Sequence, residues 1–519
     1  MSGSEAAETA DVVVVGGGGS GLAAALTAAR EGSKVLLLEK QPKLGGTTAR
    51  SVGSISASGT RLQRLAGIAD IPEQHAEDMA LFAGPLAARD NLELRRLFTE
   101  NVPETVHWLE SLGLVFFGPM PEPPHRVPRM HNVLPNSRAY LYQLSRAAER
   151  AGVRFLLGAR ATRLLTEAGR VVGVEATRAG GETLRVGARR AVILAAGDYS
   201  SGREFKEHYL APEIARIEGI NDACTGDGQR LALELGAEVV NGDVIYGPEI
   251  RFPPPGKTKF IARIPPTRAF AQLTKFALAY APSFLLRPFL MSFVTTHLAP
   301  SHKLFQEGAI LVNREGRRFV DERDRPQLAI PQQPGGIAYI VFDHTVAEKF
   351  RAWPYFISTA PGLAYAYLPD YRRHRRDIYA EANTIEELAA KIGVPAAVLA
   401  ETIADCNRAR PAETAPLATP PFVALGPAKS WIVMADGGLK VDTDLRVLGR
   451  DGKPIAGLYA AGSTGQGGLI LEGHGHHLGW AFTSGRIAGR NAARTEPTET
   501  SGGERAAAKL RAGTPAHSH

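Results

Sequence analysis

Cysteine is nearly absent from this chain of 519 residues: Cys224 and Cys406 are the only two, and neither belongs to a CxxC or CxxCH motif. Thiolate-bound iron–sulfur clusters and covalently attached c-type haem are therefore excluded. Any redox chemistry must use another cofactor. The length exceeds one ordinary hydrophobic core and indicates roughly two to three domains.

Two further absences narrow the class of protein. Residues 1–10 are small and polar and lack a charged segment followed by an apolar one, which predicts a cytoplasmic protein. The net charge is a modest +7, and no compact basic motif is interleaved with aromatic residues. The sequence therefore gives no indication of a nucleic-acid partner.

A glycine-rich turn near the start is the strongest motif present. Residues 11–40 read as an apolar strand, a Gly/Ser turn, a helix, and a second strand ending at Glu39. Within the turn, Gly16, Gly18 and Gly21 match GxGxxG. This pattern allows a tight turn, brings a pyrophosphate close to the backbone and packs helix on strand, while the acid is placed to accept hydrogen bonds from a ribose.

Later segments continue an α/β pattern. Residues 45–54 form a second Gly/Thr/Ser loop, residues 152–178 read as strands joined by a turn at 168–169, and residues 189–201 contain a buried strand that ends at Gly197. Residues 225–240 then read as a glycine turn that opens a helix.

The order GGGGSGL, acid, LGGTT, AVILAAGDYS, TGDG, GLYAAGSTGQGG and SGRIAGR resembles the FAD-dependent fumarate reductase and 3-ketosteroid dehydrogenase superfamily over residues 11–494. The resemblance implies an α/β fold in which a Rossmann-like FAD-binding domain (11–241 and 433–494) carries an inserted α+β cap domain (242–432). Residues 1–10 and 495–519 are expected to be disordered.

The resemblance also implies the residues that contact the cofactor. No second GxGxxG unit is present, so we expect no NAD(P)H domain, and the loop 45–54 contains no histidine, so we expect non-covalent FAD. The implied FAD-binding residues are Gly16, Gly18, Gly19, Ser20, Gly21, Glu39, Lys40, Gly45, Gly46, Thr47, Thr48, Ala161, Ala196, Gly197, Asp227, Gly462, Ser463, Leu478 and Ala481.

The chain departs from fumarate reductases at the positions that would hold two substrate carboxylates. Family histidines correspond to Pro248 and Met434, and the carboxylate-binding arginine to His477. The proton-donating arginine corresponds to Pro326, although Arg325 is adjacent. Because a buried dianion needs such partners, a less charged substrate is favoured.

Residues 251–306 form an insertion without a single Asp or Glu but with eight Lys and Arg residues. Within it, the apolar stretch 276–296 is interrupted by Pro282, Arg287 and Pro288, which argues against a membrane-spanning helix. Two alternatives stay open: a cap element packed on protein, or an interfacial element on an anionic membrane, which would make the protein peripheral at the inner membrane face.

Polar groups for chemistry remain at two places. Tyr246 lies at the entrance to the cap, and His474, His476 and His477 stand in the sequence EGHGHH. The resemblance to ketosteroid dehydrogenases implies that Gly475 is a backbone donor for a carbonyl. Histidine can donate or accept protons near neutral pH. Three histidines so close on one turn cannot easily face one ion, so we expect no metal.

Three functions fit these observations. The first is an FAD-dependent oxidoreductase on CH–CH bonds that desaturates or reduces an apolar, ring-ketone or steroid-like substrate next to its carbonyl, with an unidentified electron partner. The second is a fumarate- or urocanate-reductase-like enzyme on an unsaturated acid, which Arg325 and the histidines could serve. The third is a membrane-associated flavin-binding or electron-relay protein.

Overall fold

The computed structural model describes residues 8–255, 264–282, 287, 291, 294–296, 298–360, 364–410 and 415–498. Much of 276–296 and the tail beyond 498 therefore lie outside the described residues. At the N-terminus, β1 (Glu8–Val15) already includes residues 8–10, which were expected to be disordered. This correction reflects pairing with β9, because Glu8 lies opposite Val186.

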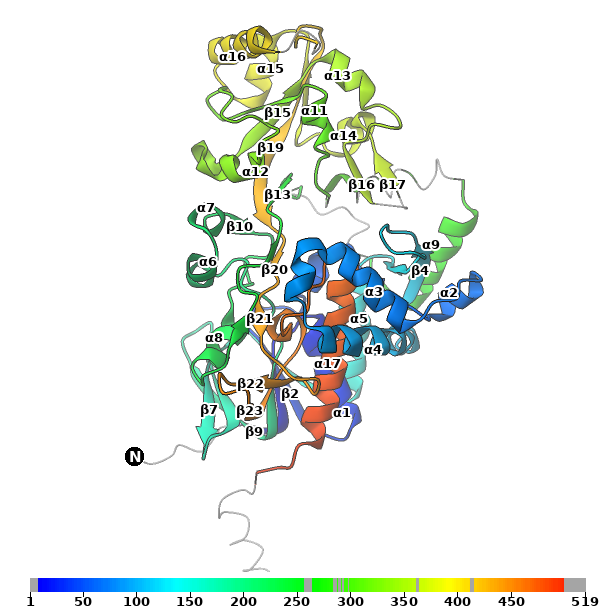
Figure 1. Cartoon of the computed structure of the whole chain (residues 1–519), viewed down its shortest axis with the longest axis vertical. Helices are drawn as coiled ribbons and strands as arrows, with labels where there is room; N and C mark the ends of the chain where they lie inside the picture. The colour runs from blue at the N-terminus through cyan, green and yellow to red at the C-terminus, as the bar shows by residue number, and fades with distance from the viewer. Residues whose placement is uncertain are drawn as a thin grey trace, which may run out of the picture.

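An eight-stranded sheet forms the lower lobe in Figure 1. Its main path is β22-β23-β9-β1-β2-β6, and β1 pairs in parallel with both β2 and β9. Val12 to Val15 are at most 5% exposed, as expected for a strand covered on both faces. The strands are β2 (Val35–Glu39), β6 (Arg154–Leu157), β7 (Ala159–Glu167), β8 (Arg170–Arg178), β9 (Thr183–Leu194), β22 (Arg446–Leu448) and β23 (Pro454–Ala460).

Helices α1 (Gly19–Arg30) and α17 (His476–Arg494) pack closely beside this sheet. Glycine makes the approach possible, because a Cβ atom at Gly485 would lie 2.4 Å from the carbonyl oxygen of Ser20. The predicted turn between β7 and β8 is also confirmed, with positive φ at Ala168 and Gly169. The backbone pattern of this lobe thus follows the sequence expectation.

A smaller layer lies beside the first lobe. It is a three-stranded antiparallel sheet of β3 (Ser54–Ser56), β5 (Met130–Leu134) and β4 (Val115–Met120). The helices of this region are α2 (Arg61–Leu65), α3 (Pro72–Ala83), α4 (Leu92–Ser111) and α5 (Arg138–Arg150).

The upper lobe in Figure 1 has its own sheet and its own hydrophobic core. The sheet consists of β10 (Glu218–Gly219), β19 (Phe422–Ile432), β15 (Ala338–Phe342) and β14 (Ile310–Val312), with β13 (Glu249–Arg251) and β18 (Tyr379–Ala382) also on β19. Because β10 belongs to this sheet, the sheet recruits residues that precede the expected domain boundary at 242. Residues 385–409 of this lobe form a helical pair, α15 (Ile385–Ile392) and α16 (Ala396–Ala409).

Two short antiparallel pairs connect the lobes. Strand β11 (Val239–Val240) pairs with β21 (Gly438–Leu439), and β12 (Ile245–Tyr246) pairs with β20 (Met434–Ala435). The segment that leads into the upper lobe (β11 and β12) therefore runs beside the segment that returns from it (β20 and β21). This pairing fixes Tyr246 opposite Met434. The remaining elements are α6 (Arg203–Tyr209), α7 (Pro212–Ala215), α8 (Asp227–Leu233), α11 (Lys303–Gln306), α12 (Pro326–Ala329), α13 (His344–Lys349), α14 (Leu368–His374), β16 (Ser358–Ala360) and β17 (Ala364–Ala366).

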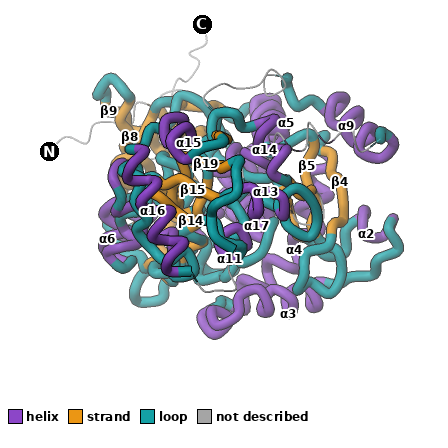
Figure 2. Tube along the Cα trace, turned by 90° about the horizontal axis from the view of Figure 1, so that it is seen from above, coloured by secondary structure: helices purple, strands orange, loops and turns teal. Residues whose placement is uncertain are grey.

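The described part of the insertion includes the long helix α9 (Arg268–Tyr280), which lies away from the sheet of the upper lobe. It packs on β4 and β5 through a cluster of Val115, Leu134 and Ala271. Seen from above, α9 stands at the edge of the molecule, apart from β14, β15 and β19 (Figure 2). Among the described residues, no helix combines the length and apolar character needed to cross a bilayer.

Candidate active site

A cavity of about 460 Å³ extends from the glycine turn after β1 to the junction of the two lobes. It is lined by the turn, the loop 45–54, the C-terminal end of β9 and the start of α17. Of the predicted cofactor residues, those that line it are Gly16, Gly18, Gly19, Ser20, Glu39, Lys40, Gly45, Gly46, Thr47, Thr48, Ala161, Ala196, Gly197, Asp227, Ser463, Leu478 and Ala481. Gly21 and Gly462 are not among the lining residues.

The glycines of the turn have two different roles. Cβ atoms at Gly16 and Gly21 would lie 2.3 Å from the oxygen of Ala195 and 1.9 Å from that of Gly16, so these two glycines serve packing. At Gly18 a Cβ atom would meet nothing nearer than the Gly46 Cα at 3.9 Å. The backbone there is open to the cavity, where a pyrophosphate can approach the start of α1.

Glu39 is buried at the end of β2, and its carboxylate points back to the turn. Its Oε2 accepts a hydrogen bond of 2.7 Å from the Gly17 N–H, and its Oε1 accepts one of 2.8 Å from the Gln41 N–H. Each oxygen keeps a second lone pair, so the carboxylate can still accept bonds from ribose hydroxyls.

Asp227, at the start of α8, also lines the cavity. It accepts hydrogen bonds from Lys40 at 2.9 Å and from Arg160 at 2.7 Å. Burial acts to raise the pKa of Asp227, but the two cations outweigh burial and lower it. The ionised carboxylate thus ties β2, β7 and α8 together around the cavity.

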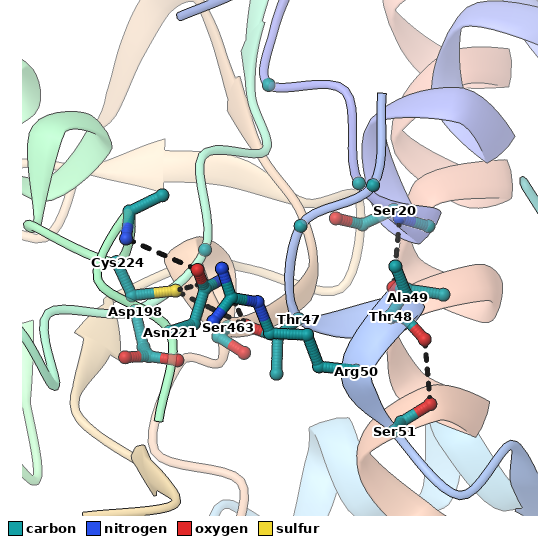
Figure 3. A pocket seen from close by; sticks show the side chains of 18 of the residues that line it. Ser20, Thr47, Thr48, Ala49, Arg50, Ser51, Asp198, Asn221, Cys224 and Ser463 are labelled. Carbon is teal, nitrogen blue, oxygen red and sulfur yellow. Dashed lines mark hydrogen bonds between the residues drawn. The ribbon is translucent and has the colours of Figure 1, made fainter. Parts of the chain in front are cut away.

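One wall of the cavity was not anticipated from the sequence. Figure 3 shows Thr47, Asn221 and Cys224 gathered at this wall. Asn221 donates to Thr47 Oγ1 at 2.9 Å and to Cys224 Sγ at 3.2 Å. Burial raises the pKa of the Cys224 thiol to about 12, which keeps it protonated and unreactive. No local sequence motif predicts this contact, because Thr47 and Asn221 are far apart in the chain.

The other end of the cavity is lined by the predicted Tyr246, His474, Gly475 and His477, together with apolar side chains and Arg251. Tyr246 and His477 face each other, with ring centroids 6.5 Å apart. Burial raises the pKa of Tyr246 to about 12, so the phenol stays protonated. The sequence does not single out Arg251 as a lining residue, because it is one of eight basic residues in the insertion.

His477 is paired with a buried carboxylate. Its Nε2 lies 2.8 Å from Oδ1 of Asp436, a residue that is 1% exposed. Burial opposes the charged imidazole, but Asp436 outweighs burial and raises the pKa of His477. Oδ2 of the same carboxylate has no hydrogen-bond partner among the residues that the structure describes.

His474 is also paired with a carboxylate, that of Glu122. Glu122 accepts hydrogen bonds from the backbone N–H of His474, at 2.9 Å, and from its ring Nδ1. The bond to Glu122 raises the pKa of His474. Gly475 follows with φ of 91°, and a Cβ atom there would lie 2.5 Å from the Ser56 backbone nitrogen. Glycine therefore lets α17 begin directly at the cavity.

The two remaining candidates lie elsewhere. His476 is fully buried and points away from the cavity, where its Nδ1 donates to the Glu472 carbonyl at 2.5 Å. Arg325 is exposed at the start of α12 and does not line the cavity. The structure thus brings His474 and His477 together with Tyr246 and leaves His476 and Arg325 outside.

Three histidines meet behind the cavity: ring nitrogens of His75, His125 and His476 lie within 4.8 Å of one another. Because Nδ1 of His476 donates, its Nε2 must accept the 3.2 Å bond from His75. Arg129 can only donate to Nδ1 of His125, at 2.9 Å, so that neutral ring carries its proton on Nε2. His125 then has no second lone pair for a metal, and the cluster acts as buried packing.

Comparisons with known proteins identify the family of this chain. A profile described as "FAD binding domain" matches residues 11–256 and 268–470. The chain belongs to this FAD-binding domain family. Together with the fit of the glycine turn and Glu39, the match confirms the expected cofactor, FAD, and the expected fold class. Whether FAD is bound non-covalently stays a prediction.

This FAD-binding chain is similar to several characterised proteins. It is 28% identical to the NADH:acrylate oxidoreductase of Vibrio harveyi, over 95% of this chain and 51% of that protein, so it spans about half of that relative's length. An open flavocytochrome c3 fumarate reductase matches with a TM-score of 0.71 and 27% identity, over 94% of this chain and 79% of that one. The 3-ketosteroid-delta4-(5alpha)-dehydrogenase of Rhodococcus jostii RHA1 matches with a TM-score of 0.59 and 26% identity, over 95% and 99%.

Proposed function

We propose that the chain is an FAD-dependent oxidoreductase that acts on the C–C or C=C bond next to the carbonyl of a neutral, largely apolar ketone. The similarity to a 3-ketosteroid dehydrogenase and to reductases of unsaturated acids supports the reaction class. The charges at the substrate end of the cavity support the neutral substrate.

The single observation that carries the substrate class is that each candidate cation that the structure describes at this end has its own carboxylate. His474 pairs with Glu122 and His477 with Asp436. Arg251 lies 2.7 Å from Glu249. A carboxylate substrate would have to compete with these internal partners after losing its own hydration, which is costly in a buried site. A ketone needs only hydrogen-bond donors.

Bound FAD would supply the hydride acceptor or donor at its ring. The chain supplies the group that transfers the proton and the site that binds the carbonyl oxygen of the substrate. For ene reduction, a proton must reach the α-carbon of the substrate while hydride reaches the β-carbon; desaturation moves both in reverse. We assign the proton transfer to His477, because Asp436 keeps its imidazole charged to a higher pH than usual.

The carbonyl oxygen needs donors when negative charge develops on it. Tyr246 offers a protonated hydroxyl at the same wall. The 19-residue helix α17 begins at Gly475 with its positive dipole end at the cavity. Both groups are preorganised for such an oxygen. Leu298, Val433 and Met434 make the rest of this end apolar.

A second candidate is a reductase of an unsaturated carboxylic acid. Arg251 in the cavity favours it, since this guanidinium could exchange Glu249 for a substrate carboxylate. The acrylate and fumarate activities of the similar proteins point the same way.

The test is a panel of oxidants for the photoreduced, FAD-loaded protein under anaerobic conditions. Reoxidation of the flavin by neutral enones of ring and steroid size, faster than by acrylate, fumarate or urocanate, is expected. Faster reoxidation by the acids would replace the proposal with the second candidate. If neither class of compound reoxidises the flavin while ferricyanide still does, the result would favour an electron-relay protein.

A further inference from the structure

Helix α9 exposes apolar side chains that the fold does not cover. Leu273 and Phe276 are each 63% exposed and Tyr280 is 75% exposed. They recur at helical spacing, so they lie on one face, and the Phe276 and Tyr280 rings are 4.8 Å apart. Leu65 at the end of α2 is 71% exposed. Isolated exposed leucines are ordinary, but an aromatic stripe on a peripheral helix indicates a partner surface.

A different face of α9 packs against the rest of the protein. Ala271 is 2% exposed and clusters with Val115 and Leu134, and Leu278 packs against the same cluster. Thr267 caps the helix by accepting a bond of 3.3 Å from the Phe270 N–H. The apolar outer stripe is therefore not required to hold α9 on β4 and β5.

A basic cavity lies next to the apolar stripe. It has a volume of about 260 Å³ and is bounded by α2, α4, β4 and α9. Arg61, Arg268, Lys275 and His107 line it, and Glu110 is the acid among its described lining residues. Glu110 is already bonded to Arg61 at 3.2 Å. Burial, and after it the charge of Arg61, lowers the pKa of Lys275, as expected for a cation with too little negative charge nearby.

The two features lie on adjacent faces of one helix. Arg268, Gln272 and Lys275 repeat at i, i+4 and i+7 toward the cavity, whereas Leu273, Phe276 and Tyr280 point to solvent. Figures 1 and 2 both place α9 at the periphery of the molecule. The sequence segment that contains it, 251–306, carries eight cations and no acid. This combination complements a surface with negative head groups above an apolar layer.

We propose that α9 docks the protein on an anionic phospholipid surface, with Leu273, Phe276 and Tyr280 entering the acyl boundary. The cavity of Arg61, Arg268 and Lys275 receives lipid phosphate. This binding is independent of the reaction proposed above, since it needs neither flavin turnover nor the substrate end of the other cavity.

The test is flotation of the full, FAD-loaded chain with vesicles. Vesicles of phosphatidylcholine with 30% phosphatidylglycerol should carry the protein at about 20 mM salt and release most of it at about 0.5 M salt, because screening weakens the electrostatic part. Pure phosphatidylcholine should bind at least tenfold less protein. Absence of binding to the anionic vesicles at low salt would overturn the proposal.

Matched variants separate the two components. L273S/F276S/Y280S should reduce binding at least tenfold, whereas L81S/W353S, at positions 61% and 64% exposed elsewhere, should bind as wild type. R268Q/K275Q should weaken binding to anionic vesicles more than R96Q/R203Q, which removes two exposed cations of α4 and α6. Flavin absorbance and the thermal transition verify folding of each variant.

A direct contact readout completes the test. Brominated phosphatidylglycerol should quench the fluorescence that Tyr280→Trp adds, whereas the native tryptophan fluorescence of the wild-type protein, which includes that of exposed Trp353, should not be quenched. Equal loss in the test and control variants would overturn the proposal. So would a dimer that the serine variant abolishes while vesicle binding persists, since α9 would then contact a second copy of the chain.

Discussion

The two ends of the large cavity are built in different ways. The FAD end is built mainly from backbone, the turn at Gly16 to Gly21 and the loop 45–54, which are joined by a bond of 3.0 Å from the Gly45 N–H to the Gly17 carbonyl. The substrate end is made of ion pairs, His474 with Glu122 and His477 with Asp436. The first end fits a cofactor shared by the whole family, whereas we propose that the second end selects the substrate of this chain.

The difference between the two ends also separates histidines that are neighbours in sequence. His477 lies at the cavity with its pKa raised, whereas His476 packs against His75 with its pKa lowered to about 4 by burial. Successive residues of a helix point about 100° apart, so His476 and His477 at the start of α17 face different surroundings. We therefore propose His477 for the chemistry, whereas His476 packs in the interior.

The largest effect on turnover is expected at the substrate end. His477→Gln should lower kcat on the best enone roughly 100-fold to 1,000-fold, because the proton donor is lost. FAD content should stay at the wild-type level, because His477 lies away from the glycine turn. Steady-state kinetics with flavin absorbance per protein measures both. His344→Gln on α13 is the control, and wild-type turnover of the His477 variant would remove its proposed role.

The next effect concerns the FAD end alone. Gly18→Ala adds a methyl group that meets no protein atom within 3.8 Å but occupies the space of the pyrophosphate. FAD affinity should fall at least about tenfold, with the fold retained. Gly21→Ala is the contrast, since its methyl would lie 1.9 Å from the Gly16 oxygen and should lower the melting temperature. Equal FAD content in Gly18→Ala and wild type would show that the turn does not contact the cofactor.

This agreement between motif and cavity shows what sequence can predict. The GxGxxG turn, β1, β2 and β7 to β9 are local patterns whose backbone geometry follows from glycine and apolar periodicity. The ion pairs are not local: Glu122 is 352 positions from His474, and Asp436 is 41 from His477. The sequence likewise could not predict that α9 packs on β4, because Ala271 could pack against any apolar surface.

A smaller effect is expected from the carboxylate behind His477. The groups facing this ring are Asp436, Glu472, Asp198 and Tyr246. Since Asp436 raises the pKa of His477, its proton is retained below the raised value and lost as pH rises through it. Asp436→Asn should shift the alkaline limb of the ene-reduction rate down by about one pH unit. An unchanged limb would mean that another group titrates, and Asp442→Asn, at an exposed surface ion pair, is the control.

The smallest effect on activity, but a measurable one on stability, is expected from the buried cluster. Burial lowers the pKa of His75, and lowers that of His125 to about 3. Each contributes stability that is complete above the unfolded pKa near 6.5 and is lost as pH falls below it. Between pH 7 and 5 the loss should be about 2 kcal/mol per histidine by urea denaturation. His75→Gln should flatten this slope, and an unchanged slope would contradict the buried neutral state.

The central claim is that the substrate end prefers a neutral carbonyl because its cations are already paired. The most direct measurement compares two ligands of one ring size, cyclohex-2-enone and cyclohex-1-ene-1-carboxylate, as anaerobic oxidants of the photoreduced protein. We predict that the enone reoxidises the flavin at least about tenfold faster, and that Asp436→Asn narrows the ratio by freeing His477 for the acid. Faster reoxidation by the carboxylate in the wild-type protein would contradict the account.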